Sequence, residues 1–463
     1  MATRDLRSLF LIGACLFAAQ AIAQVMPPTV SAAKDADWER LQALVEDGVN
    51  PNAIYGDGST ALHWASYHDN AAAAGLLIDS SANVNATTDL GATPLWLAAE
   101  NGSLEMANLL LEAGADPNIA LFSGETIVMT AAQSGNGDVV RALLAAGADP
   151  NAAVTREQTA LMWAANRGHA GAVAALIEFG ANVHARSLVR EQFVKSEKEQ
   201  DSHPAYMYWI EEGGNTALMF AARAGDLRST QLLVAAGSEI NEGNAFGTTP
   251  LIMAVHGGNP ALLETLLEAG ANVDGDGPGH TALHAAVLRG NLATVEVLLA
   301  HGADTEAVIE KPTPVRRQTT DYNFHDALIG STPLWLAARF AEPEIMQALL
   351  AAGADPFTVN NVSYPAQRRG ENYQAEEGDI NLLMAAVGMG HRRLRLSWGT
   401  PERRAGQLDR SQEDLVREAV SIALQAGVDP NQSDANGQTA LAFARERRYA
   451  SVAALFEAAG AIE

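Results

Sequence analysis

One short phrase recurs along this chain at a nearly constant spacing. It is a Thr-Pro-Leu or Thr-Ala-Leu tripeptide, or a close variant, followed by an alanine-rich segment. The first four copies start 33 residues apart. A period of this size predicts an array of stacked units, each packing only on its neighbours, rather than a globular enzyme core. The ten copies start at Thr60, Thr93, Thr126, Thr159, Thr216, Thr249, Thr281, Thr332, Asn381 (degenerate) and Thr439.

The repeat that starts at Thr93 shows what one unit contains. Threonine is a favourable first cap for a helix, and the Asn-Gly pair at 101–102 interrupts that helix. Leucines and a methionine between 104 and 111 follow helical spacing and predict a second helix. Gly114 then suits the left-handed residue that ends many helices. The segment 115–125 is left to run out and back as a finger loop.

This helix–turn–helix–finger unit resembles the ankyrin repeat. The matching features are the TPL-xx-AA phrase, the mid-repeat glycine, the paired leucines and the GADPN ending. Eleven such endings against ten beginnings imply eleven units, the first lying near residues 36–52. The resemblance implies an all-α ankyrin repeat solenoid with finger loops, a single curved array over residues 34–463. The chain is similar to exported bacterial ankyrin proteins with long insertions. This resemblance does not indicate any particular activity.

Residues 1–23 have the pattern of a secretory signal peptide. Two arginines precede an apolar stretch at 9–19, and Ala-Ile-Ala forms a small-residue cleavage site at the end. We therefore expect a cleaved signal, a short linker at 24–33, and a periplasmic or secreted protein. Cys15 follows a poor lipoprotein box, which leaves lipidation as the alternative.

Charge and cysteine content exclude several kinds of function. The formal net charge is −25, which argues against nucleic-acid binding because that needs a cationic surface. Cys15 is the only cysteine, so the mature chain is expected to lack disulfides and thiolate metal sites. The sequence has no metal, cofactor or catalytic motif, and the apolar stretch at 9–19 is too short to span a bilayer.

The resemblance gives His63 and His284 a structural role, tying neighbouring fingers together.

Four insertions lengthen the period, at 186–212, 308–328, 359–379 and 390–411. By position, the first three enlarge fingers and the fourth separates the two helices of its unit. All four are expected to be loops, of the kind that is functional or disordered. The fourth carries Arg392, Arg393, Arg395, Arg403, Arg404 and Arg410. These arginines suit either a solvated loop folding back on an acidic flank or contact with an acidic partner or lipid headgroup.

The resemblance also implies where partners bind. In similar arrays they touch finger tips and the two residues after the Ala pair of each first helix. Those helix positions are Tyr67, His68, Glu100, Asn101, Gln133, Ser134, Asn166, Arg167, Arg223, Ala224, His256, Gly257, Leu288, Arg289, Arg339 and Phe340. The tips include Asp57, Leu90, Phe122, Arg156, Phe246, Pro278, Ile329 and Asn436. In the first insertion, Tyr206, Tyr208 and Trp209 either pack beneath the loop or form a binding hot spot.

These features favour an exported, non-catalytic and monomeric protein that binds one or more proteins through a concave surface and extended fingers. It would act as a scaffold, protector or inhibitor. One alternative is an enzyme with His203, Glu211, His325 and Asp326 as acid–base groups in the inserted loops. Another is an envelope structural element or a secreted effector.

Overall fold

The computed structural model describes residues 26–154, 156–195, 207–313, 324, 326–366, 374–389 and 410–462. The predicted signal peptide lies outside these residues. The chain divides into two compact units, Met1–Thr155 and Arg156–Glu463, which are treated separately below. A single curvature running through both units therefore stays a prediction.

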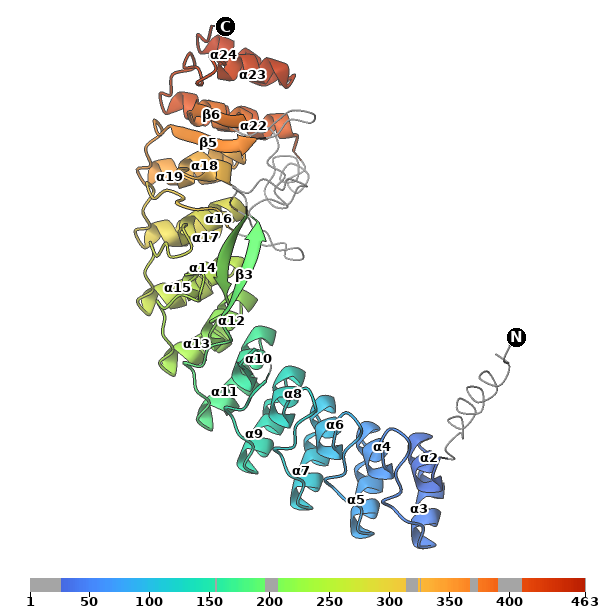
Figure 1. Ribbon diagram of the computed structural model, residues 1–463. Helices are drawn as coiled ribbons and strands as arrows, with labels where there is room; N and C mark the ends of the chain where they lie inside the picture. Colours follow the sequence, from blue (N-terminus) through green and yellow to red (C-terminus); the bar gives the residue numbers. More distant parts are fainter. Residues whose placement is uncertain are drawn as a thin grey trace, which may run out of the picture. The chain divides into compact units, whose positions relative to one another are not determined.

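Unit 1 consists, in its described residues, of four helix pairs stacked in chain order. First helices contact first helices and second helices contact second helices, which gives the two layers seen in Figure 1. The strand β1 (Ala153–Val154) closes the unit. The pairs are α2 (Pro28–Lys34) with α3 (Trp38–Glu46), α4 (Ala61–Tyr67) with α5 (Ala71–Asp79), α6 (Pro94–Asn101) with α7 (Leu104–Glu112), and α8 (Ile127–Ser134) with α9 (Gly137–Ala145).

The start of the array differs from the sequence prediction. Residues 24–33 were expected to be a linker, but most of this segment forms α2. Thr29, Val30, Ala32 and Ala33 are buried there, and α2 packs against α4. The repeat pattern did not predict this helix because α2 lacks the Thr-Pro-Leu phrase and begins instead with a proline in its first turn.

Unit 2 begins with β2 (Gln158–Thr159) and has seven helix pairs in its described residues, so the predicted total of eleven is confirmed. The pairs are α10 (Ala160–Arg167) with α11 (Ala170–Glu178), α12 (Ala217–Ala224) with α13 (Leu227–Ala235), α14 (Pro250–Gly257) with α15 (Pro260–Glu268), α16 (Ala282–Arg289) with α17 (Leu292–Ala300), α18 (Pro333–Arg339) with α19 (Pro343–Ala351), α20 (Leu382–Val387) with α22 (Gln412–Gln425), and α23 (Ala440–Glu446) with α24 (Ala450–Ala458).

Three of the four insertions contain regular structure in their described residues, although loops were expected. In the first, β3 (Arg190–Lys195) pairs antiparallel with β4 (Met207–Glu212). In the third, β5 (Asn360–Ala366) pairs antiparallel with β6 (Gln374–Ile380). The second ends in a short 3₁₀ helix, η2 (Asp326–Leu328). The fourth separates α20 from α22, as predicted.

The recurring residues have the local roles that the sequence indicates. The Thr93 hydroxyl accepts a hydrogen bond from the Trp96 amide at 3.0 Å, which caps α6. Gly102 ends that helix in the left-handed conformation, with φ +68°. The degenerate copy is equally effective, because the Asn381 side chain accepts from the Met384 amide at 2.9 Å.

At five places an asparagine in the loop after the second helix joins one repeat to the next. The Asn118 side-chain amide donates to the Gly147 carbonyl at 2.9 Å, and its oxygen accepts from the Asp149 amide at 3.0 Å. Since both ends of the side chain are used, this contact fixes the register between successive units as well as their distance. The same two-way bond is made by Asn52, Asn85, Asn241 and Asn431.

Candidate protein-binding surface

Buried histidines connect successive fingers. In unit 1, His63 Nδ1 accepts from the Thr60 amide at 3.1 Å, and Nε2 lies 3.0 Å from the Ala92 carbonyl of the next finger. His284 makes the same pair of contacts, with Thr281 and Ser331. Burial lowers the pKa of His63 and lowers that of His284 to about 4. Both rings are therefore neutral at pH 7, and their predicted structural role is confirmed.

In unit 1 the fingers are also joined through their backbones. The Asp89 amide donates to the Asp57 carbonyl at 2.9 Å, and the Phe122 amide donates to the Leu90 carbonyl at 3.1 Å. These bonds hold the tips at fixed spacing while their side chains project into solvent. Leu90 is 74% exposed and Phe122 is 83% exposed. Large apolar side chains held in this way are typical of protein-binding surfaces.

The ends of the first helices continue this surface. Tyr67, at the end of α4, is 55% exposed and packs edge-on against Trp64 with ring centroids 5.6 Å apart. Glu100 and Gln133 are exposed at the equivalent positions of α6 and α8. We refer to Tyr67, Leu90, Glu100, Phe122 and Gln133 together as the finger face of unit 1.

Several other residues predicted to bind partners also hold neighbouring helices together. The Asn101 amide donates to the carbonyls of Ser66 at 3.0 Å and Tyr67 at 3.1 Å. The Ser134 hydroxyl donates to the Ala99 carbonyl at 3.0 Å, and His68 Nε2 lies 3.1 Å from the Lys34 carbonyl. These exposed side chains join each repeat to the preceding one, a role that a single repeat does not reveal.

In unit 2, some of the predicted partner-binding positions on the first helices and finger tips, which we call the stripe, are not available to a partner. Phe340 is 1% exposed and Arg339 is 9% exposed, so the expectation that they lie on an open surface is wrong. All of α18 is buried, and it packs against α16, α19 and α20. The third insertion adds one contact, because the Trp335 indole N–H donates to the Ile380 carbonyl at the end of β6 at 2.9 Å. Leu288 and Pro278 are buried as well.

The other predicted positions of unit 2 are at least partly accessible. Asn166, Arg167, Arg156 and Asn436 are exposed, and Ile329 is 37% exposed. Arg223, Phe246, His256 and Arg289 are half-buried. Apart from its buried positions, the stripe of unit 2 thus contains open positions and positions that the protein itself partly covers.

The aromatic segment of the first insertion divides between two faces of the β3–β4 hairpin. Tyr208 is half-buried, and its hydroxyl donates to the Pro312 carbonyl at 3.4 Å, which ties the hairpin to the second insertion. Trp209 is 67% exposed and packs against Phe193, with ring centroids 5.1 Å apart. Tyr206 lies outside the described residues. Sequence reasoning missed Phe193, although the aromatic and β-branched residues at 193–194 and 206–210 could have indicated paired strands.

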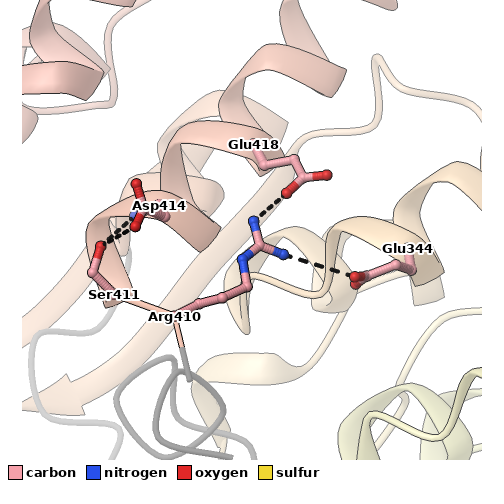
Figure 2. A network of polar contacts seen from close by, with 5 residues as sticks. All are labelled: Glu344, Arg410, Ser411, Asp414 and Glu418. Carbon is pink, nitrogen blue, oxygen red and sulfur yellow. Dashed lines mark hydrogen bonds and ion pairs between the residues drawn. The ribbon is translucent and has the colours of Figure 1, made fainter. Parts of the chain in front are cut away.

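At least one arginine of the fourth insertion is used within the protein. Figure 2 shows Arg410 between two carboxylates, with Nη1 3.8 Å from Glu344 of α19 and a hydrogen bond to Glu418 of α22. Ser411 caps α22 by accepting from the Asp414 amide at 3.0 Å, and its hydroxyl donates to the Asp414 carboxylate. This serine lowers the pKa of Asp414. The other five arginines lie outside the described residues.

The residues considered for catalysis do not form a described cluster. Glu211 is exposed on β4 and Asp326 begins η2, while His203 and His325 lie outside the described residues. Over the part of the chain that the structure covers, no three His, Cys, Asp or Glu side chains group as metal ligands. Within the same residues, no helix is long and apolar enough to cross a membrane.

Comparison with known protein families agrees with this architecture. A family model for ankyrin repeats (3 copies) matches residues 30–121, 118–187 and 218–309, and a model for the single ankyrin repeat matches 329–361. This chain belongs to the ankyrin repeat family. Ankyrin repeats are generally non-enzymatic modules that bind other proteins, so the fold indicates a protein-binding scaffold.

Individual relatives resemble only part of the protein. An ankyrin repeat and KH domain-containing protein of Caenorhabditis briggsae is 30% identical over 146 residues, which is 32% of this chain and 5% of that protein. The crystal structure of the human ASB11 ankyrin repeat domain is 26% identical, with a TM-score of 0.42. That match covers 53% of this chain and 99% of the ASB11 domain.

Proposed function

We propose that this protein is an exported, non-catalytic ankyrin repeat scaffold that binds another protein through the finger face of unit 1. The observation that carries this proposal is the pair of apolar tips, Leu90 and Phe122, exposed on fingers joined by backbone hydrogen bonds. Because the fingers are already ordered, little conformational entropy is lost when a partner docks. The aromatic ring of Tyr67 extends the same surface with an apolar body and a polar hydroxyl.

Charge restricts the kind of partner. Asp57 and Asp89 are exposed on the fingers, and Glu100 is exposed at the end of α6. In a chain of net charge −25, they favour a partner with a basic rim around an apolar centre. Export is supported by the signal-peptide pattern of residues 1–23. Binding would serve assembly of an exported protein, or its protection or inhibition.

The experiment is a crosslinked pull-down from envelope extract with the full mature chain, quantified by mass spectrometry. Leu90→Ala combined with Phe122→Ala should reduce recovery of specific partners about tenfold or more, since large buried side chains dominate interface energies. Leu104→Ala is the matched control, because Leu104 is also exposed (37%) but starts α7 in the second-helix layer. If all three proteins recover the same partners in equal amounts, the finger face is not the binding surface.

Export is tested separately. Cell fractionation combined with N-terminal sequencing should find a mature chain that begins just after Ala23, outside the cytoplasm. An uncleaved chain in the cytoplasm would refute export without bearing on the finger face.

A further inference from the structure

The β3–β4 hairpin of unit 2 presents a second surface of unusual composition. Its register places Glu191 opposite Glu211 and Phe193 opposite Trp209. Residues two apart on a strand share a face, so these four lie on one side of the hairpin, which we call the outer face, and the pair Lys195 and Met207 ends the same side. Both glutamates are exposed, Phe193 is 51% exposed and Trp209 is 67% exposed.

The opposite face of the hairpin is the one that packs on the protein. Ile210 is only 9% exposed, and the Tyr208 hydroxyl is bonded to the Pro312 carbonyl. Arg190 also lies on that side by register and forms an ion pair with Glu212 at 3.4 Å. The hairpin is therefore anchored through one face while the other is left open, even though the open face carries the larger aromatic ring.

The aromatic pair on the outer face is ordered before any partner arrives. The rings of Phe193 and Trp209 lie 5.1 Å apart with an interplanar angle of 44°, a cross-strand contact that stiffens both side chains. Tryptophan is strongly enriched among residues that dominate binding energy. An exposed and pre-positioned tryptophan thus supplies a contact of high potential affinity.

The two glutamates next to this pair repel each other. Side chains directly opposite on antiparallel strands have Cβ atoms about 4.5–5.5 Å apart, and like charges there are destabilising. Within the described part of the chain, neither the Glu191 nor the Glu211 carboxylate makes an ion pair or a hydrogen bond. A cation from outside the chain would relieve this repulsion and would lie beside the aromatic rings.

From this arrangement we infer that the outer face of the hairpin docks a basic protein segment. A lysine or arginine of that segment places its charged group between the Glu191 and Glu211 carboxylates, and its aliphatic stem lies over the Trp209 ring. Neighbouring apolar residues of the segment pack on Phe193. This site uses none of the residues of the finger face, so either surface can fail without the other.

The test measures binding of a fluorescein-labelled peptide, Leu and Lys in alternation over seven residues, to the full mature chain by fluorescence anisotropy. Two exposed ion pairs are together worth a factor of about five to ten, so Glu191→Gln with Glu211→Gln should weaken binding by that amount. Trp209→Ala should weaken it about tenfold or more, and Trp209→Phe should restore most of the loss. Circular dichroism must show each variant folded.

Two controls separate a site from general attraction to an acidic protein. Glu264→Gln with Glu268→Gln removes two exposed carboxylates one helical turn apart on α15 and should change the affinity less than twofold. The same peptide with Glu in place of Lys should bind much more weakly. An equal loss in the α15 control, no loss in Trp209→Ala, or a loss only in the finger-face variant would overturn the proposed site.

Discussion

One glycine of unit 1, Gly91, lies close to the backbone of the next finger. Gly91 has φ +87°, and a Cβ there would lie 3.1 Å from both the Ala120 carbonyl oxygen and Leu121 Cα. A left-handed residue with a side chain costs about 1–2 kcal/mol. Since the close atoms are backbone, the next finger must also shift by a few tenths of an ångström, which strains the hydrogen bond from the Phe122 amide to the Leu90 carbonyl and costs up to about 1 kcal/mol more. Gly91→Ala should therefore destabilise unit 1 by about 1–3 kcal/mol.

Gly114 provides a matched control in the same unit. Its φ of +86° is almost the same, but a Cβ there would meet nothing within 4 Å. Gly114→Ala should suffer the backbone strain alone, about 1–2 kcal/mol. The difference between the two variants isolates the contact between fingers.

Hydrogen exchange of the Phe122 amide, together with urea unfolding of the full chain, measures both effects. Exchange at this amide should accelerate in Gly91→Ala and stay near the wild-type rate in Gly114→Ala, because only the first variant strains its hydrogen bond. Equal loss of stability in the two variants, with Phe122 still protected in both, would show that finger packing does not depend on close approach at Gly91.

Three further predictions concern unit 2. Burial lowers the pKa of His284 from its ordinary value of 6.5 to about 4, so the unfolded chain binds this proton more readily and stability falls as the pH drops from 6.5 to 4. In His284→Gln the free energy of unfolding, measured with urea, should fall less with acid than in wild type. The difference should reach about 3 kcal/mol over this pH range. Trp335→Phe removes the buried bond to the Ile380 carbonyl and should cost about 1–3 kcal/mol, measured as a lower thermal midpoint. Arg410→Gln should lower stability by less than about 1 kcal/mol, because its ion pairs with Glu344 and Glu418 are partly exposed. Exchange near the start of α22 should nevertheless accelerate, and added salt should reduce the difference from wild type.

The repeat architecture could be predicted because its signals are local. A capping threonine, a glycine with positive φ and leucines at helical spacing each act within one unit, and the period then repeats the result. Even the departure at Asn381 kept the capping chemistry and was placed correctly. The α2 helix was missed for the same reason, since its sequence lacks the phrase.

The candidate site could be predicted only in part. Position in the repeat correctly brought Tyr67, Leu90 and Phe122 to an open surface. It could not indicate that Asn101 is used to hold the preceding helix, because that bond joins residues 35 positions apart.

The sequence by itself determined the helical hairpins, their number and the residues that cap and separate them, because each of these depends on neighbours within about one period. The tertiary structure alone decided which side chains of the stripe stay open. Phe340 holds the same place in its repeat as the exposed Asn101 and Ser134 do in theirs, yet it is 1% exposed. Trp209 and Phe193 became one exposed surface only through strand pairing. Insertions carry no period, so their effect on exposure follows from the contacts they make in space.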